Sequence, residues 1–210
     1  MNANLIDWEA QLWWWNGATY DAKAIWYTEL YDENEEGLGY AGWGDFDMWM
    51  PIVKTFAPGE SFWIQVNDSA AVADATFTMA GQVESVSQAD QYYAIPVIPG
   101  VQQQLTNPFP TGNLSLQNIK MSDKLIDGQA QLWWWNGATY DAKAIWYTEL
   151  YDENEEGLGY AGWGDFDMWM PIEKTFSNGE AFWVQVNDSA KAEDATVSFP
   201  NPFYKAPAAE

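Results

Sequence analysis

The sequence contains no cysteine, no histidine and no arginine. Without cysteine the chain can form no disulfide and offers no thiolate as nucleophile or metal ligand. Without histidine it lacks the commonest general base and the commonest ligand of transition metals. These absences argue against catalysis, and we expect a protein that binds or builds something rather than an enzyme.

Positive charge is also scarce, since eight lysines stand against 31 acidic residues and the formal net charge is −23. Nucleic-acid binding depends on lysine and arginine contacts with phosphate, so the sequence predicts no nucleic-acid partner. Its apolar runs are far shorter than the roughly 20 residues of a membrane helix, so it predicts no membrane insertion. Hydrophobic residues make up 48% of the chain, which is enough for a folded core.

An internal repeat dominates the sequence. Ala10–Ile52 and Ala130–Ile172 are identical over 43 residues, at an offset of 120. The similarity continues with conservative changes, such as Ile64 for Val184, and fades near Phe77 and Val197. We therefore predict two homologous modules, residues 1–81 and 82–210. The first has no counterpart of Ser85–Lys124, the segment that leads into the second repeat.

Strand signals recur along each module. Ala10–Trp15 is rich in aromatic residues and is followed by Asn16-Gly17, a strong hairpin signal. Similar β-rich stretches follow at Ala24–Tyr31, Asp45–Met50, Ser61–Val66, Ala75–Met79, Tyr92–Val97 and Leu114–Ile119. A helical period is absent, apart from one possible turn at Ser69–Asp74. The predicted fold is all-β, with two tandem homologous antiparallel β-sandwich-like modules.

A triple tryptophan occurs in each repeat: Trp13, Trp14 and Trp15, and again Trp133, Trp134 and Trp135. Side chains alternate across a strand, so the outer two of each triplet share one face and the middle one lies on the other. Exposed tryptophan stacks well on sugar rings, which suggests a glycan platform. Burial of all three in packed layers or in a subunit interface is the alternative.

An acidic loop is also duplicated. Asp32, Asn34 and Glu36 place oxygen ligands at alternate positions, and a glycine stands sixth, as in the first half of a calcium-binding loop. Asp152, Asn154 and Glu156 repeat the pattern. The twelfth position holds tryptophan instead of a bidentate glutamate. Calcium is the one cofactor that the sequence suggests, and a solvated acidic turn is the alternative.

Carboxylate pairs, as used by glycosidases, are available at Asp45 and Asp47 with Glu29. With 31 acidic residues such pairs arise by chance, and exact duplication of a site suits multivalent binding better than turnover. We predict no catalytic residue.

Two motifs together resemble a known family. Leu105-Thr106-Asn107-Pro108-Phe109-Pro110 is followed by an aromatic tract and then by Gly179-Glu180-Ala181-Phe182-Trp183-Val184. This order is similar to the Asn-Pro-Phe/Tyr-Pro β modules repeated in large secreted bacterial surface proteins. The resemblance implies an all-β fold and an extracellular or cell-surface location, and it implies no activity.

These observations predict that the protein is a structural subunit of an extracellular filament or cell-surface assembly. Its predicted partner is another copy of the same chain. The tail Asn201, Pro202, Phe203 and Tyr204 resembles the segment that the first module lacks, so we predict that it is donated to the first module of the next molecule. Alternatively, the tail folds back on its own chain, or Val83–Val97 covers the gap. The alternative function is a bivalent module that binds surface glycans through exposed tryptophan.

Overall fold

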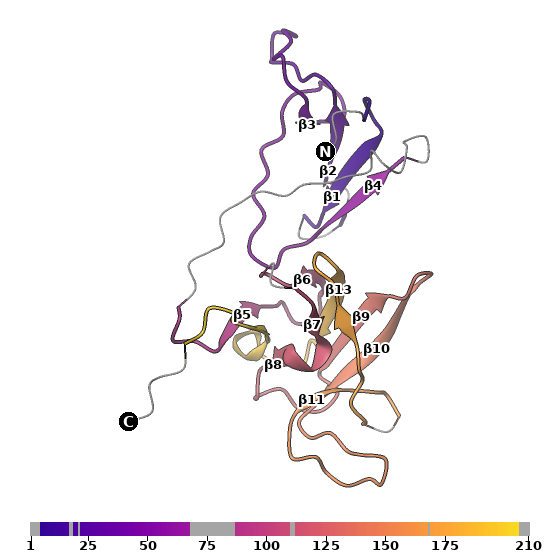
Figure 1. The fold of residues 1–210 in the computed structure, drawn as a ribbon, viewed down its shortest axis with the longest axis vertical. Helices are drawn as coiled ribbons and strands as arrows, with labels where there is room; N and C mark the ends of the chain where they lie inside the picture. Colours follow the sequence, from indigo (N-terminus) through magenta and orange to yellow (C-terminus); the bar gives the residue numbers. More distant parts are fainter. Residues whose placement is uncertain are drawn as a thin grey trace. The chain divides into compact units, whose positions relative to one another are not determined.

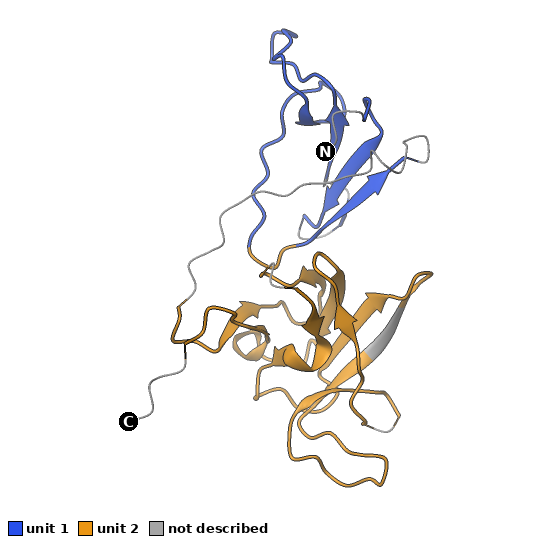
Figure 2. Cartoon of the chain, viewed as in Figure 1, with its two compact units in different colours: residues 1–57, 61–82 blue, residues 58–60, 83–210 orange. Residues whose placement is uncertain are grey.

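The computed structural model describes residues 5–16, 19–20, 22–67, 87–109, 112–167 and 169–205. The chain divides into two compact units (Figure 2): unit 1 comprises Met1–Ala57 and Ser61–Gln82, and unit 2 comprises Pro58–Glu60 and Val83–Glu210. The fold is all-β and its sheets are antiparallel, as the sequence predicts. Among the described residues, no helix has the length and apolar character needed to span a bilayer.

Unit 1 contains one four-stranded sheet of order β3-β2-β1-β4 (Figure 1). Its strands are β1 (Ala10–Trp14), β2 (Ala22–Tyr27), β3 (Gly42–Gly44) and β4 (Phe62–Val66). The hairpin between β1 and β2 begins at Asn16, whose side chain accepts a hydrogen bond from the Thr19 backbone N–H (2.9 Å). The asparagine thereby stabilises the turn that the sequence predicts.

Unit 2 contains a five-stranded sheet of order β11-β10-β9-β13-β6, a three-stranded sheet β5-β14-β8 and a two-stranded sheet β12-β7. The strands are β5 (Tyr92–Pro96), β6 (Gln102–Thr106), β7 (Leu114–Ser115), β8 (Lys120–Met121), β9 (Ala130–Trp135), β10 (Tyr140–Tyr147), β11 (Gly162–Gly164), β12 (Thr175–Phe176), β13 (Ala181–Val186) and β14 (Thr196–Pro200). Two 3-10 turns, η2 (Leu116–Asn118) and η3 (Ala192–Asp194), complete the described elements.

The sheets of unit 2 share one core. Phe182 on the five-stranded sheet and Phe199 on the three-stranded sheet are fully buried, with ring centroids 6.2 Å apart. Leu116 and Ile119, around η2, belong to the same cluster. Unit 2 is therefore a two-layered, sandwich-like arrangement.

The repeats have the same strand order, β3-β2-β1-β4 matching β11-β10-β9-β13. Trp13 is paired with Trp63 in the first repeat as Trp133 is with Trp183 in the second. The strand order is therefore the same in both repeats, although the pairing of β9 with β10 has a register shift between Ala142 and Ala144 where the pairing of β1 with β2 is continuous.

Two predicted strands are wrong in part. The segment Asp45–Met50 forms a turn, because the Asp45 carboxylate accepts hydrogen bonds from the backbone N–H of Met48 (2.8 Å) and Met50 (3.4 Å). Leu114–Ile119 is a strand for only two residues and then becomes η2. The segments Ala75–Met79 and Ser69–Asp74 lie outside the described residues.

Candidate functional site

The most marked difference between the repeats lies at β4 and its counterpart β13. In unit 2, β6 pairs with β13 along the edge that faces away from β9, with Leu105 opposite Phe182 and Gln103 opposite Val184. In unit 1, β4 is the last strand of the described sheet.

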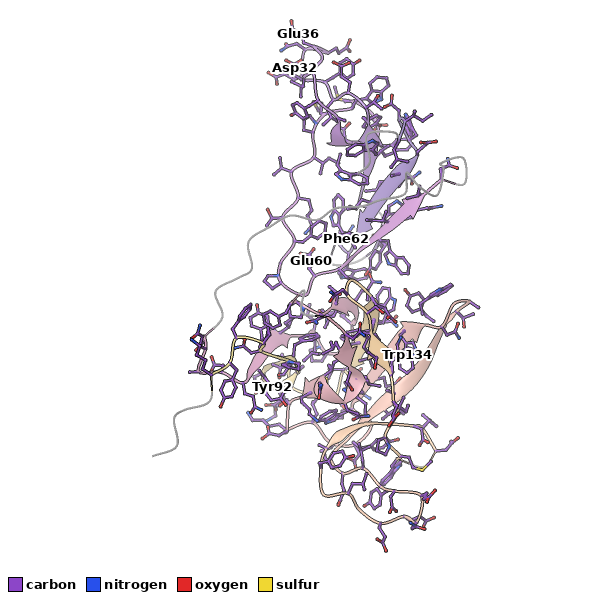
Figure 3. All side chains as sticks on the ribbon, in the orientation of Figure 1. Asp32, Glu36, Glu60, Phe62, Tyr92 and Trp134 are labelled. Carbon is purple, nitrogen blue, oxygen red and sulfur yellow. The ribbon has the colours of Figure 1, made fainter. Side chains whose placement is uncertain are left out.

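The burial of β4 reflects this difference. In unit 2, the side chains of Phe182, Val184 and Val186 point into the core and are fully buried. Their counterparts Phe62, Ile64 and Val66 are only half-buried (Figure 3 labels Phe62). We call the face that carries these side chains the inner face of each sheet. Its half-covered state in unit 1 leaves apolar surface in contact with water.

One side of the β4 backbone faces away from β1. Asn67 N–H donates to Glu9 O (2.7 Å), which fixes the alternation of the ladder with β1. The N–H and C=O groups of Phe62, Ile64 and Val66 therefore point away from β1. In unit 2 the equivalent side of β13 bonds to other parts of the chain, as where Gly100 N–H donates to Val186 O (2.8 Å).

The tryptophan triplets are divided between the two faces of each sheet. Trp14 and Trp134 lie on the inner face, where their rings contact Phe56 (6.1 Å) and Phe176 (6.2 Å) edge-on. The outer two of each triplet lie on the opposite face, which we call the outer face, and are partly exposed, Trp135 the most at 47%. The triplets are thus neither wholly core nor wholly surface.

The outer face carries an aromatic pair and an amide pair in each unit. In the first, Trp13 stands opposite Trp63, and Gln11 stands opposite Gln65. The second repeats this with Trp133 opposite Trp183 and Gln131 opposite Gln185. A polar hollow lies beside the amides in both units, lined in part by Gln11, Gln65 and Asn67, and by Gln131, Gln185 and Asn187. Glu9 also lines the first hollow and Asp188 the second, and amides and a carboxylate beside indole rings are suited to an uncharged, hydroxyl-rich ligand.

The acidic loops form ordered turns. Asp32 Oδ1 accepts hydrogen bonds from the backbone N–H of Asn34 (2.8 Å) and Glu36 (2.9 Å), and Asp152 does the same with Asn154 and Glu156. The bonds from Glu36 and then Asn34 hold the pKa of Asp32 below its ordinary value, and the matching bonds lower the pKa of Asp152. Figure 3 labels Asp32 and Glu36 in this loop.

In the part of the chain that the structure describes, no group of three or more carboxylates is placed to hold a metal. The turn uses the Asp32 carboxylate to organise its own backbone. Calcium binding therefore stays a prediction.

The tail packs on its own unit. Asn201 is buried, and its side-chain amide donates to Ser87 O (2.8 Å) and Asp90 O (2.7 Å). Phe203 lies edge-on to Phe109, with ring centroids 6.0 Å apart. This is the fold-back arrangement that the sequence left open, and donation of Asn201, Pro202, Phe203 and Tyr204 to another molecule stays a prediction.

The similarity of the tail to the Asn-Pro-Phe segment extends to geometry. Asn107 Oδ1 accepts a hydrogen bond from Phe109 N–H (3.1 Å), and Asn201 Oδ1 accepts one from Phe203 N–H (2.9 Å). Both segments therefore form the same asparagine-stabilised turn.

The sequence did not predict the role of Gln117, a polar residue that connects η2 with β11 and with the segment that follows β11. Its side chain contacts the backbone of Trp163 and Ile172, which lie 46 and 55 residues further along the chain. The nearest sequence signal is the spacing of the buried Leu114, Leu116 and Ile119 around it.

Comparison with protein-family models, with curated proteins and with solved structures found no match for this chain. The resemblance to the Asn-Pro-Phe/Tyr-Pro modules consequently stays a prediction, and the function must be argued from the geometry.

Proposed function

We propose that the chain is a structural subunit of an extracellular filament or cell-surface assembly, joined to its neighbours by addition of a strand at β4. The observation that carries the proposal is the contrast between two nearly identical strands. The strand β13 is paired with β6 and its inner-face side chains are buried, whereas β4 is the last strand of its sheet among the described residues and its inner-face side chains are half-buried. The extracellular setting is supported by the family resemblance alone.

Strand addition fits this edge on physical grounds. A donated strand would pair along the side of β4 that faces away from β1, and its apolar side chains would cover the half-buried Ile64 and Val66. Because the donating and accepting surfaces differ, the contact is heterologous and propagates into a fibre unless it closes into a ring. The tail Asn201–Tyr204 is the donor that the sequence predicts, and it must first leave its own unit.

Light scattering and negative-stain imaging of the purified chain test this proposal, with Ile64→Pro as the blocking variant. Proline at residue 64 removes an N–H that points away from β1 and leaves the ladder with β1 intact. We expect polymers from the native chain and monomers from Ile64→Pro. The control is Gln65→Ala, which changes an exposed outer-face side chain next to it and should polymerise normally. A native chain that stays monomeric at high concentration would refute the proposal.

A second function is favoured by a separate observation, the duplicated outer face. Its paired tryptophans and glutamines support binding of neutral glycans at two equivalent sites per chain. Titration with uncharged oligosaccharides, followed by tryptophan fluorescence, should give two sites in the native chain. Trp63→Ala and Trp183→Ala should each remove one site, and binding that both variants retain in full would exclude this face.

A further inference from the structure

Trp8 of unit 1 and Gly128 of unit 2 occupy the same position in the two repeats, just before β1 and β9. The backbone is the same at both, since Trp8 N–H donates to Trp26 O (3.0 Å) and Gly128 N–H donates to Trp146 O (2.9 Å). Their φ angles are 70° and 77°, in the left-handed region that favours glycine. The two positions therefore differ in the side chain and not in the path of the chain.

The indole of Trp8 covers an aromatic platform, which we define as Tyr27, Phe46 and Trp49. The indole lies edge-on to Tyr27 (5.8 Å between ring centroids) and to Phe46 (5.0 Å), and Tyr27 stacks on Trp49 (5.5 Å). A bulky residue rarely adopts a left-handed backbone, so the ring contacts must offset the strain at Trp8. The platform of unit 1 is therefore a favourable place for an indole.

Unit 2 repeats the platform with Tyr147, Phe166 and Trp169, but glycine stands where the indole would begin. Tyr147 stacks on Trp169 (5.3 Å) as in unit 1. Phe166 is 77% exposed, whereas Phe46 is 44% exposed. A Cβ built on Gly128 would have no described atom within 4 Å. The place of the indole in unit 1 is thus open in unit 2, beside an exposed phenylalanine ring.

The polar hollow of unit 2 begins at the same glycine. Gly128 lines it together with Gln131 and Asn187, and its volume is about 290 Å³. The matching hollow beside Trp8 in unit 1 measures about 160 Å³. Amide side chains next to the open position can bond to a peptide backbone, so the surroundings favour a side chain that arrives on a polypeptide.

The charge around the platform is negative. Burial, followed by the charges of Asp165, Asp127 and Asp167, raises the pKa of the Tyr147 hydroxyl. In unit 1 the ammonium of Lys23 lies 3.9 Å from the centroid of the matching phenylalanine ring. Carboxylates beside an exposed aromatic ring attract a ligand with positive charge.

We infer that unit 2 binds a tryptophan side chain of a partner polypeptide, beside Gly128 and against Phe166, with basic residues next to that tryptophan facing the carboxylates. Unit 1, which holds Trp8 in the same place, is the occupied form of this site. No tryptophan of the chain has a lysine as its neighbour in sequence, so the partner is a different protein. The inference goes beyond the proposed function, because it uses neither β4 nor the tail.

Fluorine NMR of the tripeptide Lys-Trp-Lys, with a fluorinated indole, tests the inference on the full chain. The fluorine signal reports on the probe alone, although the chain contains 15 tryptophans. We expect one bound tripeptide per chain, with a Kd of roughly 1 mM because the site is open to water. The tripeptide Glu-Trp-Glu should bind about fivefold more weakly, and the difference should shrink as salt is added.

The repeats supply a matched pair of variants. Gly128→Trp installs the residue of unit 1 and should lower the affinity about tenfold or more, because its own indole fills the site. Trp8→Gly installs the residue of unit 2 and should create a second site of similar affinity. The control is Trp135→Ala, which removes another exposed ring of unit 2 and should leave the binding unchanged.

Equal affinity of the native chain and Gly128→Trp, or no binding of Lys-Trp-Lys to the native chain, would overturn the inference. If circular dichroism shows that Gly128→Trp does not fold, Phe166→Ala replaces it. That variant removes an exposed ring and should lower the affinity about tenfold, and unchanged binding would again overturn the inference. A chain that binds the tripeptide but never polymerises would refute the filament and leave the tryptophan site standing.

Discussion

The difference in burial between Phe182 and Phe62 leads to a quantitative prediction. Phe182 is fully buried, with the rings of Phe176 at 4.9 Å and Phe199 at 6.2 Å. Truncation of a phenylalanine in such a site to alanine costs about 3–5 kcal/mol of unfolding free energy. Phe62 keeps the matching contact with Phe56 (4.8 Å) but is half-buried, so Phe62→Ala should cost roughly 2 kcal/mol.

Hydrogen exchange followed by mass spectrometry measures separately the loss of stability caused by Phe182→Ala and that caused by Phe62→Ala. Most peptides of the repeats are identical and cannot be assigned, but those of β4 and β13 differ through Ile64 and Val184. Local opening energies at these strands do not require the two units to unfold together. We expect Phe182→Ala to cost about 2 kcal/mol more at β13 than Phe62→Ala costs at β4, roughly a 30-fold difference in the opening equilibrium. Equal costs would show that the inner face of unit 1 is as well covered as that of unit 2.

Two other predictions concern pH and calcium. Burial, followed by the charges of Asp45, Asp7 and Asp47, raises the pKa of Tyr27 to about 12. The neutral Tyr27 hydroxyl therefore stabilises the fold fully below pH 10, and this stabilisation is lost as the pH rises from 10 to 12. The urea midpoint of unfolding should fall over that range, and it should fall less steeply in Tyr27→Phe. If the acidic loops bind calcium, a calcium concentration a hundred times Kd should raise the free energy of unfolding by about 2.7 kcal/mol. A chelator, or the double variant Asp32→Asn, Asp152→Asn, should abolish this gain. An unchanged melting temperature on chelation would argue for a solvated turn.

Much of the fold could be predicted because its signals are local. The aromatic strands, the Asn16 turn and the duplication are all visible within short stretches of sequence. The segment Asp45–Met50 misled because alternation of polar and apolar residues is typical of a strand, whereas the Asp45 carboxylate captures two nearby N–H groups and turns the chain. Trp49 there has a φ of 59°, a conformation that the alternation pattern does not anticipate.

The site was less predictable, because it depends on contacts between distant residues. A glutamine between apolar residues gives no sign that it bonds to the backbone of Trp163 and Ile172 far along the chain. The different burial of two nearly identical strands was equally invisible in the sequence. Only the structure shows that Phe62 is half-buried where Phe182 is fully buried.

The substitution Asn201→Ala distinguishes a tail that stays on its own unit from a tail that is donated to another molecule. The Asn201 amide donates to two carbonyls, Ser87 O and Asp90 O, so Asn201→Ala should destabilise unit 2 by about 2 kcal/mol if the tail stays on its own unit. The loss should be visible as faster exchange in β14, which directly precedes it. If the tail is donated in solution, the same substitution would spare the monomer and weaken the polymer.

Phe203→Ala separates the two roles further. Phe203 is 41% exposed, so its truncation should cost the monomer no more than roughly 1 kcal/mol. In a donated tail, however, its ring fills the pocket that corresponds to that of Phe109, and its loss should shorten or abolish the polymer. We expect Asn201→Ala to destabilise unit 2, because the buried amide already has its partners. Polymers of normal length from Phe203→Ala would then exclude the tail as the donated segment.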